Sequence, residues 1–245
     1  MVVEHFTYMS GLRRHQLVVA SVALAVVVAL GWYFTVRQAE GMDGMAGTMG
    51  LGLGAFLLMW LPMVVAMMFP AAVASATTAV RAHPARATVF LVVYLAVWMV
   101  FGLVTYVVLA GAERVLSIPP DGQKWLAAGI YLVAGVYQFV PAKTRCRELC
   151  RSTRPAADYG DVARTAARHG LTCIGCCAGF MVVLIAVGMA NLVAMALLTV
   201  VIFAERFFWP STVSRVAGAL LLVAAVLTPF VSWLHPGLPG PAPMM

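Results

Sequence analysis

Five stretches of this sequence stay apolar over about the thickness of a lipid bilayer, which leaves few folds open to the chain. A helix that crosses the hydrocarbon core needs about 20 predominantly apolar residues. Backbone N–H and C=O groups find no water there, so only helices and closed barrels can span a bilayer. Runs of this length predict an all-α, polytopic transmembrane helix bundle. The five stretches cover approximately residues 15–36, 52–79, 88–110, 124–141 and 213–234.

A further apolar stretch begins at Leu171, continues to Phe208 and is interrupted only by Gly188–Asn191. A single helix of this length would extend over about 50 Å, well beyond a hydrocarbon core of ~30 Å. Two short helices joined at Gly188–Asn191 fit better and form the fifth and sixth of about seven membrane segments. This hairpin can either span the membrane or re-enter it from one side.

Composition agrees with a membrane protein. The chain is 63% hydrophobic and only 10% charged, whereas soluble domains are about 45–50% apolar and about 25% charged. The 245 residues suit one membrane domain over residues 1–245. Residues 142–170 are predicted to be the only long loop and to be cytoplasmic. The tail, residues 235–245, is rich in Pro and Gly and is predicted to be disordered.

The net charge of +7 follows the predicted topology. If the N-terminus is cytoplasmic, only three of the sixteen Lys and Arg residues, Arg37, Arg114 and Lys124, fall outside. Basic residues in short loops mark the cytoplasmic side. We therefore expect a multi-pass protein of the inner (cytoplasmic) membrane, with its N-terminus inside and its C-terminus outside. The expected partner is the lipid bilayer, and the charge calls for no nucleic acid.

The five cysteines form two groups, Cys146 and Cys150 in one, and Cys173, Cys176 and Cys177 in the other. The last three are spaced i, i+3, i+4, so they share one face of a helix. All five are predicted to lie on the cytoplasmic side, where thiols stay reduced, so metal or redox chemistry is favoured over disulfides. Clustered thiolates suit Cu(I) or Zn(II). His169 is a further candidate ligand. The alternative is that cysteine packs here as a small apolar residue.

Methionines form a second pattern of candidate ligands. Met59, Met63 and Met67 make an i, i+4, i+8 stripe on the second segment, and a Gly-rich loop at 37–50 carries three more: Met42, Met45 and Met49. Thioethers bind Cu(I) but hold Zn(II) poorly, so a methionine path toward cysteines indicates copper. Core packing is the alternative for the stripe. The loop is expected to be exposed, where methionine gains nothing from packing.

Motifs for nucleotide-driven or His-based metal chemistry are absent from the sequence. It contains no Walker loop, no dinucleotide fingerprint and no His-Glu-x-x-His. No catalytic residue is therefore predicted, and an enzyme is the less favoured class. Polar groups within apolar segments often mark function. Asn191 is expected to cap or turn the hairpin, Gln138 lies near the end of the fourth segment, and Glu205 and Arg206 are expected at the membrane interface.

Several stretches resemble a bacterial family of uncharacterised, predicted metal-binding integral membrane proteins, often labelled membrane copper chaperones. They are "MMFPA" from Met67, "YLVAGVYQFVPAKTRCRELCR" from Tyr131, "HGLTCIGCCAGFM" from His169 and "GMANLVAMALLTVVIFAERF" from Gly188. The resemblance covers about residues 52–210 and implies a multi-helix membrane protein with a metal site at the cysteines. The chain departs from the family at Ala190, where a methionine is usual, and at Ala194, where a tryptophan is common. These departures leave the cysteines untouched.

The leading hypothesis is a membrane protein that handles Cu(I), by transport or by chaperone-like delivery to a membrane or metalloenzyme partner protein. One alternative is a membrane thiol–disulfide oxidoreductase in which Cys173 and Cys176 exchange, at the start of a helix. Another is a structural membrane subunit whose cysteines bind zinc and pin the cytoplasmic loop. The identity of the bound metal, if any, distinguishes these three hypotheses.

Overall fold

The structure is a computed structural model that describes residues 22–40, 42, 47–80, 84–115, 120–208 and 210–231. Over these residues the fold is all-α, without a strand. The first helix is described over Val22–Ala39. The helices that follow are α2 (Leu53–Val80), α3 (Pro84–Val115), α4 (Pro120–Tyr137), α5 (Pro141–Arg151), α6 (Tyr159–Val187), α7 (Leu192–Phe207), α8 (Pro210–Leu227) and the short 3-10 helix η1 (Thr228–Phe230).

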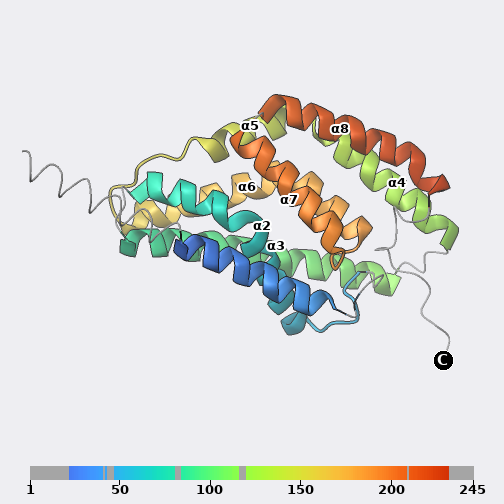
Figure 1. Cartoon of the computed structure of the whole chain (residues 1–245), viewed down its shortest axis with the longest axis horizontal. Helices are drawn as coiled ribbons and strands as arrows, with labels where there is room; N and C mark the ends of the chain where they lie inside the picture. Colours follow the sequence, from blue (N-terminus) through green and yellow to red (C-terminus); the bar gives the residue numbers. More distant parts are fainter. Residues whose placement is uncertain are drawn as a thin grey trace, which may run out of the picture.

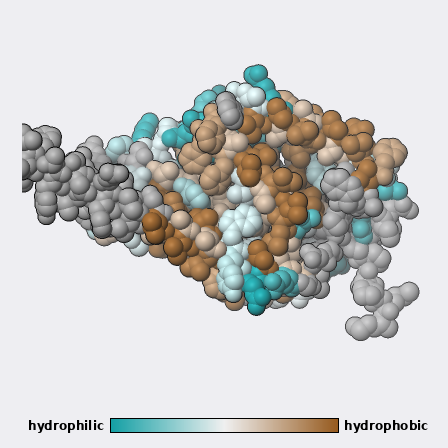
Figure 2. All heavy atoms as spheres, in the orientation of Figure 1, coloured by the Kyte–Doolittle hydropathy of each residue, from teal (hydrophilic) through white to brown (hydrophobic). Residues whose placement is uncertain are grey.

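Five of the described helices are long and apolar enough to cross a membrane, which is compatible with a membrane protein. The α4–α5 pair, bent by 63°, brings the number to six if it counts as one span. α7 has only 16 residues, slightly fewer than a crossing usually needs. The predicted number of seven segments is therefore not confirmed. Hydrophobic side chains cover most of the described surface on the face shown in Figure 2.

The predicted hinge between the fifth and sixth segments is confirmed. α6 ends at Val187, and Gly188 follows with φ of 103°, a conformation that costs glycine little because it has no Cβ. The Oδ1 atom of Asn191 accepts a hydrogen bond from the backbone N–H of Ala194 at 2.9 Å. Asn191 therefore caps the first turn of α7, as such side chains do at helix N-termini.

The prediction of a long loop at 142–170 is wrong, because most of this segment is helical. α5 begins at Pro141, where a proline suits the first turn of a helix. α6 begins at Tyr159, and Asp158 caps it by accepting from the N–H of Asp161 at 2.8 Å. Only residues 152–158 lie between the two helices. These helical turns are rich in arginine, so a search for apolar runs does not find them.

Because α6 begins at Tyr159, its cysteines lie farther from the start of the helix than predicted. Cys173 lies about 20 Å from the start of α6 at 1.5 Å per residue. The cysteines of α6 therefore lie near the middle of a 29-residue helix, not at a helix start as expected.

The helices form two groups (Figure 1). α2, α3 and α6 pack together, α4 pairs with α8, and α7 contacts both α6 and α8. α5 crosses from the end of α4 onto α6. The interior of the first group holds Trp60 and Trp98, and the Trp60 indole N–H donates to the Trp98 carbonyl at 3.1 Å. The same apolar core contains the methionines of α2, Cys150 of α5 and the cysteines of α6.

Candidate metal centre

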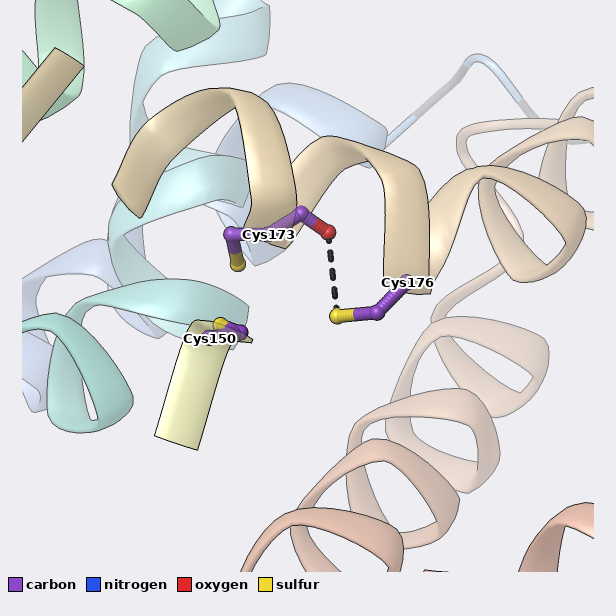
Figure 3. Close-up of side chains that lie close together, drawn as sticks. All are labelled: Cys150, Cys173 and Cys176. Carbon is purple, nitrogen blue, oxygen red and sulfur yellow. Dashed lines mark hydrogen bonds between the residues drawn. The ribbon is translucent and has the colours of Figure 1, made fainter. Parts of the chain in front are cut away.

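Three cysteines from two helices converge on one point (Figure 3). Cys150 comes from the C-terminal end of α5, and Cys173 and Cys176 come from α6; their sulfur atoms all lie within 4.8 Å of one another. Metal–thiolate bonds are about 2.3 Å long, so three sulfurs around one ion lie about 4 Å apart. The cluster could therefore bind a metal ion with only small side-chain movements.

Hydrogen bonds orient two of these thiols. The Cys176 thiol donates to the Cys173 carbonyl at 3.2 Å. The Cys173 sulfur shares a hydrogen bond of 3.3 Å with the phenol of Tyr94, a buried residue of α3. Groups in this position orient metal ligands and tune their affinity. Tyr94 is therefore placed to stabilise a metal-bound thiolate at Cys173.

The three thiols differ in their access to the surroundings. Cys150 and Cys173 are buried, with 2% and 3% of their surface exposed, whereas Cys176 is partly exposed. A thiol that a partner can reach is the one at which ligand exchange can begin. Cys176 is therefore the accessible side of the cluster.

The remaining two cysteines lie next to the cluster. The Cys177 sulfur is 3.6 Å from that of Cys176, and the Cys177 side chain is buried. Cys146 lies at the contact between α5 and α6, where it faces Gly175. The structure thus brings three of the five predicted thiol ligands together and places two beside them.

Gly175 allows α5 to approach α6 closely. A Cβ atom on Gly175 would lie 2.8 Å from the Cys146 sulfur, too close for an ordinary contact. Gly175→Ala should therefore shift the Cys146 side chain and, with it, the contact of α5 on α6 that positions Cys150, and lower the metal affinity of the cluster by up to about tenfold, as losses around a metal site commonly do. The measurement is a Cu(I) competition titration.

The double variant Gly175→Ala/Cys146→Ala removes the atom that clashes and should recover most of the affinity. Gly129→Ala in α4 is the control, because a Cβ there meets nothing within 4 Å. Equal affinity in wild type and Gly175→Ala would contradict this role of the glycine.

The structure does not bring His169 into the cysteine cluster. The His169 side chain is buried, and its ring centroid lies 5.7 Å from that of Phe90 and 5.7 Å from that of Tyr94. It therefore packs between α3 and α6, one helical turn before Cys173. Its ring contacts that of Tyr94, whose phenol in turn reaches the Cys173 sulfur.

The methionine stripe of α2 lies in the core. Met59, Met63 and Met67 are buried in the same hydrophobic cluster that contains Cys150, Cys173 and Cys177. This placement agrees with packing, and it also puts thioethers near the thiols. The assignment of these methionines as ligands stays a prediction.

The two described methionines of the loop are not exposed, contrary to expectation. Met49 has only 6% of its surface exposed and Met42 is half-buried; Met45 lies outside the described residues. The backbone N–H and the hydroxyl of Thr48 both donate to the Glu113 carboxylate, at 2.5 and 2.7 Å. These bonds hold the loop against the end of α3, where Met49 gains packing contacts.

Sequence reasoning missed a buried polar network around Lys143. Its ammonium group has no exposed surface and contacts the Glu205 carboxylate at 2.7 Å, the Gln138 side-chain carbonyl and, at 3.2 Å, the Ser214 hydroxyl. Arg147 also reaches Glu205, at 3.3 Å. Glu205 is therefore buried as the counter-ion of a buried lysine, and the expectation that it lies at the membrane interface stays a prediction.

The network is relevant to the metal centre because Lys143 precedes Cys146 and Cys150 by three and seven residues on α5. It ties this helix to α7 through Glu205 and to α8 through Ser214. Gln138 and Glu205 were recognisable as polar residues in apolar segments. Lys143 was not, because it lies in a segment with several other basic residues.

Comparison with protein families matches residues 57–228 to the PpoB2 family, described as copper chaperone. The chain belongs to this family. The match includes the five cysteines, the methionine stripe of α2 and the Lys143 network, and it confirms the resemblance to membrane copper chaperones. Searches among curated proteins and among solved structures found no match.

Proposed function

We propose that this PpoB2-family protein is an integral membrane protein that binds Cu(I) as cargo through Cys150, Cys173 and Cys176. The observation that carries the proposal is the convergence of three thiol sulfurs within 4.8 Å in a chain of a copper chaperone family. Membrane insertion is supported by the five long apolar helices. The distribution of basic residues favours the cytoplasmic side for the end of the bundle that carries α5.

The chemistry of the cluster favours Cu(I) over harder ions. Its three groups are all thiols, and thiolates select soft metals such as Cu(I), Zn(II) and iron–sulfur clusters. The surrounding core includes the thioethers of Met63 and Met67, which bind Cu(I) but not Zn(II) well. A zinc site of structural type would normally have four ligands, and the group within 4.8 Å has three.

Delivery of the ion to a partner protein needs no nucleotide, because soft ligands can exchange one at a time. The partly exposed Cys176 is where a partner thiol would first reach the ion. Cys177, whose sulfur lies 3.6 Å away, can replace a ligand that leaves. In this proposal Cys150 and Cys173, which are buried, release the ion last.

The methionines supply a route to the cluster in the same proposal. Met42, Met45 and Met49 gather Cu(I) near the opposite membrane surface, and Met59, Met63 and Met67 pass it along α2. The burial of the α2 methionines in one cluster with the cysteines supports this order.

The thiol–disulfide alternative is weakened because it relied on a thiol pKa lowered by the start of a helix. Cys173 and Cys176 lie far from the N-terminus of α6, and the field of a helix terminus falls off within one turn.

The metal content of the anaerobically purified protein tests the proposal. We expect about one copper ion per wild-type chain by mass spectrometry, and almost none in the Cys150→Ser/Cys173→Ser/Cys176→Ser triple variant. Zinc in the wild type, lost in the variant, would support a structural zinc site instead. The absence of any metal from a Cu(I)-loaded wild type would contradict the proposal and favour thiol redox chemistry.

A further inference from the structure

A cavity of about 190 Å³ lies between α2, the end of α5 and α7. Its lining contains two guanidinium groups and two hydroxyl groups, and it contains no carboxylate and no cysteine. The lining residues are Ala74, Ser75, Arg151, Thr153, Arg206 and Phe207. The cavity therefore shares no lining residue with the metal centre, although Arg151 directly follows Cys150 in the sequence.

Polar atoms of the lining residues are left without partners. Arg206 donates one hydrogen bond to the Ser75 hydroxyl, at 2.9 Å. Its other terminal nitrogen, Nη1, and the Thr153 hydroxyl are both buried and have no hydrogen-bond partner among the described residues. Unsatisfied buried polar groups are rare in native proteins because each costs free energy.

The positive charge of the cavity is also uncompensated. Within the described part of the chain, neither Arg151 nor Arg206 forms an ion pair with a carboxylate. Two arginines with free donors, beside hydroxyl donors, form the arrangement that binds phosphate and carboxylate groups.

We propose that this cavity binds an oxyanion, a phosphate or carboxylate group held by Arg151 and Arg206 with the hydroxyls of Ser75 and Thr153. A volume of about 190 Å³ admits such a group together with water, since one water molecule occupies roughly 30 Å³. The anion supplies the acceptors that Arg206 Nη1 and Thr153 Oγ1 lack. The group belongs either to a phospholipid headgroup or to a small soluble anion.

Two measurements distinguish these sources without using copper. Equilibrium dialysis of the delipidated full-length protein in detergent measures binding of radiolabelled inorganic phosphate. Native mass spectrometry of protein extracted with its lipids measures retained phospholipid. The variants are Arg206→Gln and Arg151→Gln, and the matched control is Arg145→Gln, which removes the same charge from an exposed position on α5.

We expect the wild type to bind phosphate saturably, about one per chain, with at least a tenfold loss of affinity in both cavity variants and none in Arg145→Gln. Loss of a retained phospholipid in both cavity variants would support the same site with a lipid as its source. Unchanged phosphate and phospholipid binding in both variants would overturn the proposal. The Arg151 side chain is exposed and forms no hydrogen bond or ion pair with another described residue, so Arg151→Gln should leave the fold intact and keeps the test valid if Arg206→Gln fails to fold.

Discussion

Cys173→Ser should lower the affinity of the protein for Cu(I) by more than about 100-fold. Cys173 contributes one of three converging thiols and receives the contact from Tyr94. Loss of an outer-shell partner commonly costs about 10–100-fold in metal affinity, so loss of a ligand should cost more. A serine hydroxyl nearly matches the thiol in shape but is a poor ligand for a soft ion. Competition with a chromogenic Cu(I) chelator under anaerobic conditions measures the change.

The five single Cys→Ser variants should lose Cu(I) affinity to different extents, according to whether each sulfur belongs to the converging group. Cys150→Ser and Cys176→Ser should resemble Cys173→Ser, because all three sulfurs belong to one group. Cys177→Ser should cost about tenfold or less, since its sulfur lies beside the group. Cys146→Ser, on the same helix as Cys150, is the matched control and should bind nearly as wild type. Equal losses in all five variants would rule out a three-thiol site.

Lys143→Met should destabilise the protein by about 3–5 kcal/mol, because it leaves a buried carboxylate without its main counter-ion. The Lys143 ammonium group is fully buried and lies 2.7 Å from Glu205. Arg147 remains within 3.3 Å of Glu205, but its side chain is partly exposed, unlike that of Lys143. Thermal unfolding in detergent measures the stability. Cu(I) affinity should fall too, since Lys143 helps to position α5.

The double variant Lys143→Met/Glu205→Met removes both charges together. A buried ion pair replaced by apolar side chains of similar volume often costs little, so the double variant should be more stable than Lys143→Met alone. Arg164→Met is the control for loss of a cation. Its contact with Asp161, at 2.6 Å, is solvent-exposed, and such pairs contribute less than about 1 kcal/mol. A double variant less stable than Lys143→Met would refute the pairing argument.

The break between α6 and α7 could be predicted because its signals are local. Gly188 permits a positive φ and Asn191 caps the next helix, and both properties belong to single residues. The helical character of 141–151 was missed for the opposite reason. Its turns are polar on the outside and are held by burial of Lys143 and Cys150 against other helices, which a search for apolar runs cannot detect.

The sequence predicted that the candidate site consists of thiols, but not which three of the five cysteines come together. Spacing along one helix predicted that Cys173, Cys176 and Cys177 share a face, and two of them, Cys173 and Cys176, belong to the converging group. The third member of the converging group is Cys150, from another helix, and Cys177 lies beside it. The buried state of Met49 was likewise missed, because it depends on hydrogen bonds between Thr48 and Glu113, 65 residues away.

The sequence by itself determined the all-α class, the long apolar helices, the hinge and the soft character of the ligands. Each of these depends on side-chain chemistry and on spacing within one segment. Only the tertiary structure decided which three thiols meet, which charges are buried and where two arginines face an open cavity. Those outcomes depend on how α5 packs across α6 and how its buried lysine reaches α7 and α8, and contacts between distant segments leave no periodic pattern in the chain.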